Sequence, residues 1–241
     1  ATSTNPIALT YTALAGDVGV NNFWVFACDD KSLSNSCSSA GSGVTWTQST
    51  ANSQWAARER HTSVVFNQQV WVIGGNSSSN DVWYSSDGIT WAQSTANAQW
   101  AGRDEHTSLV FSVSGENRMW VSGGFTSTQV NNVWYSTTGI TWTQSTANSQ
   151  WAGRRYHTSL VFNDGTNKMW VIGGCTAADC TTRVNDVWYS SDGITWTQST
   201  ANAQWAARYR YTSLVFNDGT NKMWIIGGDT GALQNDVWYS T

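Results

Sequence analysis

The chain has 241 residues and a formal net charge of −4, and only 12% of its residues are charged. This negative balance argues against a nucleic-acid backbone as the main partner. No apolar run approaches the ~18 residues of a membrane-spanning helix, so we expect no membrane insertion. The opening residues, ATSTNP, are compatible with a mature chain left by cleavage after a small residue.

All seventeen tryptophans fall into four columns of one repeating unit. Their spacing within a column is about 45 to 54 residues where both copies are complete, which is typical of propeller blades. The columns are Trp24, Trp83, Trp134, Trp188 and Trp238; Trp46, Trp91, Trp142 and Trp196; Trp55, Trp100, Trp151 and Trp205; and Trp71, Trp120, Trp170 and Trp224.

One complete unit begins at Arg154 and contains four segments rich in β-branched and aromatic residues, separated by turn residues. These segments predict four strands: HTSLVF (157–162), KMWVIGG (168–174), DVWYS (186–190) and ITWTQST (194–200). A four-stranded meander of this kind cannot bury both of its faces alone, so its copies must stack. Radial stacking predicts an all-β fold, a β-propeller.

Three copies share an arginine and a histidine at the first strand, a Gly-Gly pair after the second, a tyrosine in the third and a tryptophan in the fourth, and a fourth copy shares part of this pattern. This pattern resembles the kelch repeat of the galactose oxidase/kelch superfamily. Its residues are Arg58, His61, Gly74, Gly75, Tyr84 and Trp91; Arg103, His106, Gly123, Gly124, Tyr135 and Trp142; Arg154, His157, Gly173, Gly174, Tyr189 and Trp196; and Arg208, Tyr211, Gly227, Gly228 and Tyr239. The last copy has tyrosine in place of histidine and stops before its fourth strand.

The repeats predict a single domain, 1–241, with about five four-stranded blades. The first unit is a degraded copy with an insertion, and the last is incomplete. The predicted units are 1–50, 51–95, 96–146, 147–200 and 201–241.

The four cysteines form two pairs that are close in the sequence, Cys28 with Cys37 and Cys175 with Cys180. Three connectivities are possible, and pairing of neighbours is the simplest. The spacing does not match a zinc site. Two disulfides would indicate an oxidising compartment, so we expect a secreted or cell-surface protein.

Most of the repeated aromatic residues are expected to fill the wedges between blades. The column in the links between blades leaves two interpretations open. Its rings could stack on sugars, as in a multivalent lectin with sites between blades, or act as apolar plugs. The residues concerned are Trp55, Trp100, Trp151 and Trp205.

Three histidines, His61, His106 and His157, recur at one position of the first strand, and Tyr211 breaks the series. Equivalent residues on separate blades are usually too far apart to share one metal ion. The galactose oxidase relatives use copper with a Cys–Tyr crosslink, for which two disulfides leave no cysteine. We therefore expect no metal and no cofactor.

Two regions vary against this uniform scaffold: the pair of residues after each leading arginine, and the loop after Gly-Gly. Both lie at the same end of a blade, so they predict a binding face. The resemblance to peptide-binding kelch domains adds the leading arginines, whose alternative role is a blade-to-blade ion pair with Asp81 or Asp186. The candidate binding residues are Arg58, Arg60, Arg103, Asp104, Glu105, Arg154, Arg155, Tyr156, Arg208, Tyr209 and Arg210.

These features together predict an extracellular recognition module that holds a protein segment or a glycan on one loop face. The alternatives are the multivalent lectin and a structural repeat domain of a surface adhesin. No constellation of acid, base and nucleophile occurs in only one copy, so an enzyme is not expected.

Overall fold

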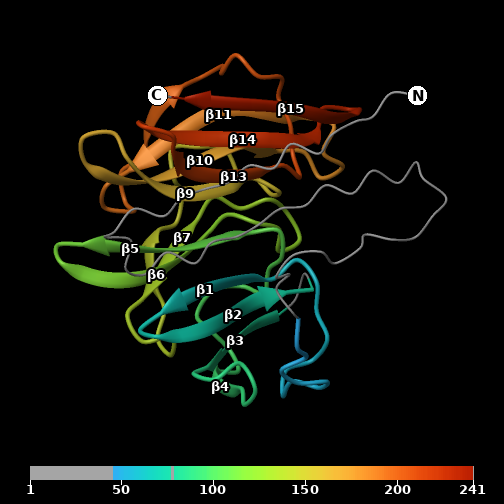
Figure 1. The fold of residues 1–241 in the computed structure, drawn as a ribbon, viewed down its shortest axis with the longest axis vertical. Coiled ribbons are helices and arrows are strands. Elements are labelled where there is room, and N and C mark those ends of the chain that lie inside the picture. Colours follow the sequence, from blue (N-terminus) through green and yellow to red (C-terminus); the bar gives the residue numbers. More distant parts are fainter. Residues whose placement is uncertain (1–45, 77–78, 241) are drawn as a thin grey trace, which may run out of the picture. The chain divides into compact units, whose positions relative to one another are not determined.

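The structure is a computed structural model that describes residues 46–76 and 79–240. The chain divides into two compact units, Ala1–Thr47 and Gln48–Thr241. The fold described below is that of the second unit (Figure 1). The predicted first unit, 1–50, and the pair Cys28–Cys37 lie almost entirely outside the described residues.

Fifteen strands are described, and all neighbours within a sheet are antiparallel. The first two sheets contain β1 (Thr62–Phe66), β2 (Gln69–Gly75), β3 (Ser79–Ser85) and β4 (Ala92–Thr95), then β5 (Thr107–Val113), β6 (Glu116–Ser122), β7 (Val133–Ser136) and β8 (Thr143–Thr146). The other two contain β9 (Thr158–Asn163), β10 (Asn167–Cys175), β11 (Arg183–Ser190) and β12 (Thr197–Thr200), then β13 (Thr212–Asn217), β14 (Asn221–Asp229) and β15 (Leu233–Ser240).

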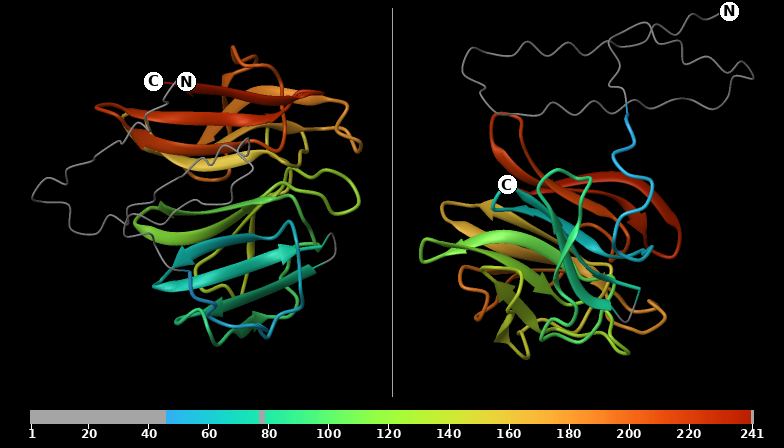
Figure 2. Two further views of the ribbon diagram at one scale, coloured as in Figure 1. Left: turned by 45° about the vertical axis from the view of Figure 1, so that its right-hand side comes forward. Right: turned by 90° about the horizontal axis from the view of Figure 1, so that it is seen from below.

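Each sheet is a meander in sequence order, and the first strands β1, β5, β9 and β13 lie side by side in that order. Figures 1 and 2 show the sheets following one another as blades. The predicted all-β propeller of four-stranded blades is thereby confirmed. The predicted count of about five is corrected: the described residues form four blades, because the segment assigned to an additional first blade lies outside them.

The core lies between successive blades, where the tryptophan columns meet. At the first interface, Trp71 and Ile73 of β2 pack with Met119 and Val121 of β6. The same arrangement recurs at the second and third interfaces. Burying one large apolar side chain contributes roughly 2–3 kcal/mol, so these interfaces stabilise each blade through its neighbours.

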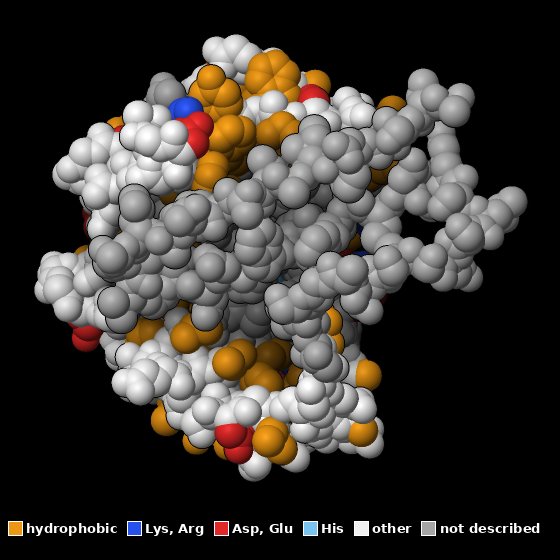
Figure 3. Space-filling model, in the orientation of Figure 1, with side chains coloured by type: hydrophobic (Ala, Val, Ile, Leu, Met, Phe, Trp, Pro, Cys, Tyr) orange, Lys and Arg blue, Asp and Glu red, His pale blue; other side chains and the backbone are white. Residues whose placement is uncertain are grey.

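The fourth sheet differs because it has three described strands and an open apolar face. Phe216 and Tyr239 are 55% and 58% exposed, whereas Phe66, the counterpart of Phe216 in the first sheet, is buried. Figure 3 shows hydrophobic side chains at the surface over the part of the molecule that contains β13–β15.

The Gly-Gly pairs lie at or just after the ends of the second strands, at points where the backbone of the leading segment of the same repeat comes very close. Gly75 has φ +105°, and a Cβ there would lie 2.8 Å from the carbonyl oxygen of Glu59. Gly124 would likewise bring a Cβ to 2.7 Å from the oxygen of Asp104. These contacts explain the need for glycine and bring each leading segment against the loop that follows Gly-Gly.

Candidate functional site

The two variable regions meet at the loop end of each blade. In three of the four described blades, the residue after Gly-Gly forms two backbone hydrogen bonds with the first variable residue of the leading segment. Phe125 pairs in this way with Asp104 at 2.9 and 3.1 Å, and Cys175 pairs with Arg155 at 3.0 Å in both directions. Both predicted variable regions therefore contribute to one continuous surface, which we call the loop face.

The second variable residue of each pair occupies a left-handed backbone conformation. The φ angles are +58° at Arg60, +55° at Glu105, +52° at Tyr156 and +55° at Arg210. The Glu105 N–H donates to the Arg60 oxygen at 3.2 Å, and the Tyr156 N–H donates to the Glu105 oxygen at 3.1 Å. These bonds link the tight turns of successive blades, so the variable side chains are neighbours across blades.

Glu105 is the centre of charge on this surface. Its carboxylate is buried and lies 3.0 Å from Arg60 of the preceding segment and 3.1 Å from Arg155 of the following one. Arg60 also contacts Asp104, at 3.4 Å. A buried carboxylate held by two guanidinium groups fixes three leading segments relative to one another.

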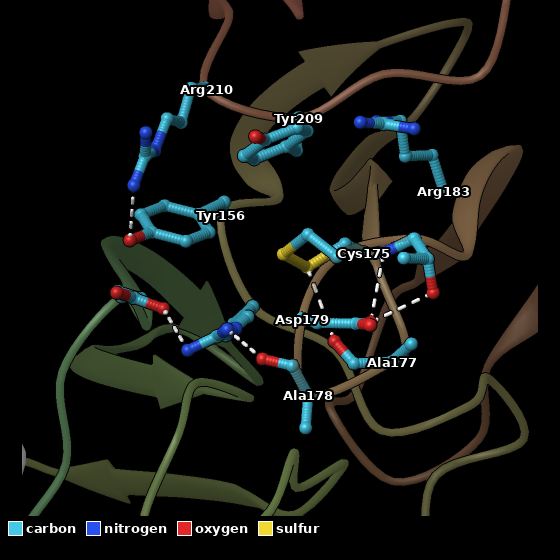
Figure 4. Close-up of a disulfide and its surroundings, with 12 residues drawn as sticks. Tyr156, Cys175, Ala177, Ala178, Asp179, Arg183, Tyr209 and Arg210 are labelled. Atoms are coloured by element: carbon cyan, nitrogen blue, oxygen red, sulfur yellow. Dashed lines mark hydrogen bonds and ion pairs between the residues drawn. A yellow bond between two sulfur atoms is a disulfide. The ribbon is translucent and has the colours of Figure 1, made fainter. Parts of the chain in front are cut away.

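Tyr156, Tyr209 and Arg210 form a stacked cluster beside this charge centre. The Arg210 guanidinium donates to the Tyr156 hydroxyl at 2.9 Å and lies 4.5 Å from the centre of the Tyr156 ring. The two tyrosine rings are 5.6 Å apart, and Arg183 lies over Tyr209 at 5.2 Å (Figure 4). Arg210 is exposed and forms no ion pair with any carboxylate in the described part of the chain.

The hydrogen bond to Tyr156 raises the pKa of Arg210 above its usual value. Burial raises the pKa of Tyr156 and outweighs the opposite effect of the Arg210 hydrogen bond. At neutral pH the cluster therefore presents a permanent cation between two neutral aromatic rings. Such a surface offers flat contact area and directed N–H donors together.

The disulfide Cys175–Cys180 supports the edge of the cluster. This predicted pair is confirmed, with its Cα atoms 5.1 Å apart. The loop that it closes turns the carbonyl of Ala178 toward the Arg155 guanidinium, which donates to it. Arg155 also lies 4.7 Å from the ring centre of Phe125. The loop thus holds the arginine that contacts Glu105.

The four leading arginines lie beneath the loop face, within their own repeats. Arg58, Arg154 and Arg208 pair with Asp81, Asp186 and Asp236, and Arg103 bonds to Asn132. Their side chains are almost fully buried. Each pair joins the start of a repeat to its own third strand, rather than joining successive blades. We therefore leave these four residues out of the proposed contact surface.

Three of the four tryptophans in the links between blades are packed as plugs, and the fourth, Trp55, is half-buried. Trp100 is 1% exposed and meets the edge of Trp142 at 6.0 Å, with Arg103 over its ring at 5.6 Å. Trp151 and Trp205 are also buried. Buried rings leave no face for a sugar, so this geometry favours the plug interpretation over the lectin sites.

The recurring histidines join neighbouring blades by hydrogen bonds. The Nε2 of His106 lies 2.9 Å from the Thr62 hydroxyl, and that of His157 lies 3.1 Å from the Thr107 hydroxyl. Burial lowers the pKa of His106 and of His157 to about 3, with Arg103 and Arg154 adding to the effect. Within residues 46–76 and 79–240, no cluster of three or more metal-ligating side chains occurs.

Sequence reasoning missed Phe125, Ala178, Arg183 and Asp229 as neighbours of the cluster. All four lie in or beside the loops that follow Gly-Gly. The variation of these loops in length and sequence between repeats was the signal that could have identified them. Which of the loop residues turn toward the leading segments depends on pairing such as that of Tyr209 with Asp229, which no sequence pattern specifies.

The fold places the protein in the class of β-propellers with four-stranded blades, and its loop face varies from blade to blade. The KLHDC2/KLHL20/DRC7 Kelch-repeats domain then matches residues 61–240. The chain therefore belongs to this Kelch-repeat family. Among solved structures, that of YjhT is similar, with a TM-score of 0.53 and 15% sequence identity.

The similarity to YjhT covers 76% of this chain and 67% of the other. At this level of identity it supports the propeller fold alone. A search of curated protein sequences finds no match. In the part of the chain that the structure describes, no helix is long and apolar enough to span a bilayer.

Proposed function

We propose that this chain is a non-catalytic recognition module that holds a segment of another protein on its loop face. The observation that carries the proposal is the cluster of Tyr156, Tyr209 and Arg210. Its guanidinium is exposed, is oriented by a tyrosine hydroxyl, and has no carboxylate partner among the described residues. Tyrosine and arginine are the residue types that most often anchor protein interfaces.

The neighbouring charges favour a fixed surface over a flexible one. Arg60 and Arg155 are occupied by Glu105, so they hold the frame and are less available to a ligand. Arg210 is therefore the strongest free donor of the cluster. A peptide that presents an acceptor to Arg210 and an apolar side chain to the tyrosine rings would match this surface.

We also propose that the protein is secreted or displayed on the cell surface. Disulfides persist in oxidising compartments, and the loop closed by Cys175–Cys180 holds Arg155 beside the cluster. A glycan is the second candidate ligand, since partly exposed tyrosine rings also stack on sugars. A structural repeat domain of an adhesin would not need a variable polar face, so the loop face favours a binding role over that alternative.

The test is a screen of the 241-residue chain against a displayed peptide library and a glycan array, followed by titration of each hit. Arg210→Ala and Tyr209→Ala should each weaken binding by about 1–3 kcal/mol, the range for interface anchors. The matched control is Lys222→Ala, which removes a cation lying 4.6 Å over Tyr239 beside Asp218.

The control should leave affinity unchanged, because the turn at Asp218 joins β13 and β14 and the loop face is formed by the other ends of these strands. If the screen finds only glycans as hits, the ligand is a sugar and not a peptide. Equal affinities of the wild type and the two cluster variants would show that binding occurs elsewhere.

A further inference from the structure

A cation covers the tyrosine of the third strand in three of the four described blades. The pairs, measured from the cation to the centre of the ring, are Arg118 with Tyr135 at 4.3 Å, Lys168 with Tyr189 at 4.6 Å and Lys222 with Tyr239 at 4.6 Å. A cation over an aromatic face is attracted by the negative charge density of the ring. The repeat therefore builds the same cation–π contact on blade after blade.

The first blade keeps the ring of this contact and lacks the cation. The strand register identifies the position: Lys168 pairs with Phe162 in the third blade, and Gln69 pairs with Phe66 in the first. A neutral amide thus stands where the other blades place a charged side chain. Among the described residues, no lysine or arginine lies over the ring of Tyr84.

A shorter hairpin accounts for this difference. Only Asn67 and Gln68 join β1 to β2, and their φ angles are +49° and +61°. Two residues with positive φ form the tight turn that suits a hairpin. In the third blade, residues 164–166 make the connection and supply Asp164, whose carboxylate lies 2.7 Å from the Lys168 ammonium. The first hairpin has neither the cation nor the carboxylate that would hold it.

A cavity of about 300 Å³ opens at this position, between two complete blades, β1–β4 and β5–β8. Its lining includes Gln69, Trp71, Tyr84, Gln93 and Ser94 of the first blade and Thr138 of the second. None of these side chains carries a charge at neutral pH, and four of them offer an amide or hydroxyl oxygen. The volume lies at the lower end of the range for small-molecule sites.

The oxygen atoms of this lining are available to a ligand. At the second interface, the Ser145 hydroxyl donates to the Gly193 carbonyl at 2.9 Å. Ser94 is the equivalent residue of the first blade. Within residues 46–76 and 79–240, the side chains of Ser94 and Gln93 form no hydrogen bond with each other or with any neighbour. They can therefore accept from N–H donors that enter the cavity.

We propose that this cavity is a binding site for a primary alkylammonium group, the group that Lys168 supplies within its own blade. The bound ammonium lies over the Tyr84 ring and donates to the oxygens of Gln93 and Ser94, and its alkyl chain packs against Trp71. The net charge of −4 favours the approach of a cation. This site is separate from the loop face, because the turn between β1 and β2 lies at the opposite end of the blade.

The experiment titrates n-butylammonium, which reproduces the end of a lysine side chain, into the isotopically labelled 241-residue chain at constant ionic strength. The side-chain amide signals of Gln69 and Gln93 are followed by NMR. We expect them to shift saturably. The neutral analogue 1-butanol should bind about fivefold more weakly, because it lacks the cation–π contact. Equal binding of 1-butanol would overturn the proposal.

Gln69→Lys tests the position directly. It places a tethered ammonium over Tyr84, as Lys168 is placed in the third blade, so it should weaken n-butylammonium binding at least tenfold without lowering the melting temperature. Gln68→Lys is the matched control. It adds the same charge one residue away, but Gln68 does not line the cavity, so binding should persist. Equal losses in the two variants would show general charge repulsion and would overturn the proposal.

A lysine peptide distinguishes the two sources of such a group. Acetyl-Gly-Lys-Gly-amide that binds more tightly than n-butylammonium would identify the ligand as a lysine side chain of a partner. Weaker binding of the peptide would identify it as a free amine. Both results support the site, and the absence of saturable shifts with either probe would overturn it.

Discussion

The Arg103 guanidinium donates to the amide oxygen of Asn132 at 2.8 Å, at a position where the other three described repeats place an aspartate. The second terminal nitrogen of Arg103 and the indole N–H of Trp134 have no hydrogen-bond partner among the described residues. In the third blade, the aspartate at this position accepts from both groups, Arg154 and Trp188. Burial lowers the pKa of Arg103 to about 10.

Asn132→Asp should therefore stabilise the chain. A carboxylate would accept from the second guanidinium nitrogen and from the Trp134 indole, and bonds to charged groups contribute about 1.5–3 kcal/mol. We expect the free energy of unfolding in urea to rise by about 1–3 kcal/mol. Asp81→Asn in the first blade is the reverse exchange and should lower it. A less stable Asn132→Asp variant would contradict this account.

Removal of Glu105 should destabilise the loop face strongly. Glu105→Ala leaves Arg60 and Arg155 facing each other without the buried carboxylate between them. Breaking a buried pair in this way costs about 3–5 kcal/mol, which denaturation would detect. Glu116→Ala is the control, because Glu116 is exposed and pairs with Arg118 at the surface. It should change stability by less than about 1 kcal/mol; similar losses in both variants would count against the role of Glu105.

Trp100 should behave as a structural plug. Trp100→Ala removes a ring that is 1% exposed and is packed against Trp142, so it should cost about 3–5 kcal/mol of stability. Trp46 is 93% exposed, and Trp46→Ala should change stability by under about 0.5 kcal/mol. If Trp100→Ala melted at the wild-type temperature, the plug interpretation would be wrong.

The repeat made the fold predictable because four columns of tryptophan constrain every strand at once. The strand predicted at 186–190 lies inside β11, Arg183–Ser190, which extends further into the loop. The blade count was less secure, because the unit 1–50 matched the repeat only in part. Degraded copies weaken the periodic signal on which the count rests.

The loop face was predictable as a region but not as a site. Variation at Tyr156 and Arg210 could be read from the sequence, but their contact joins residues 54 positions apart. It depends on the left-handed turns at these two residues. The role of the leading arginines also stayed open, because burial beneath a face and exposure on it give the same sequence pattern.

Acid should weaken the fold before any aspartate titrates. His106 and His157 have pKa values of about 3 in the folded chain because they are buried, against about 6.5 when unfolded. Well above pH 6.5 the two histidines are neutral in both the folded and the unfolded chain, so they do not reduce the stability of the fold. As the pH falls from 6.5 toward 3, the unfolded chain binds protons that the folded chain does not, so stability is lost.

Each histidine contributes up to about 1.4 kcal/mol per pH unit in that window. The free energy of unfolding in urea should therefore fall by up to about 4 kcal/mol between pH 7 and pH 5, where unfolded aspartates with a pKa of about 3.9 still remain charged. Burial also lowers the pKa of His61, so it adds to the same loss. His157→Tyr, which copies Tyr211 of the fourth blade, removes one of the two most strongly shifted groups and should clearly reduce the loss. A loss of the same size in His157→Tyr would show that this histidine does not drive the acid response.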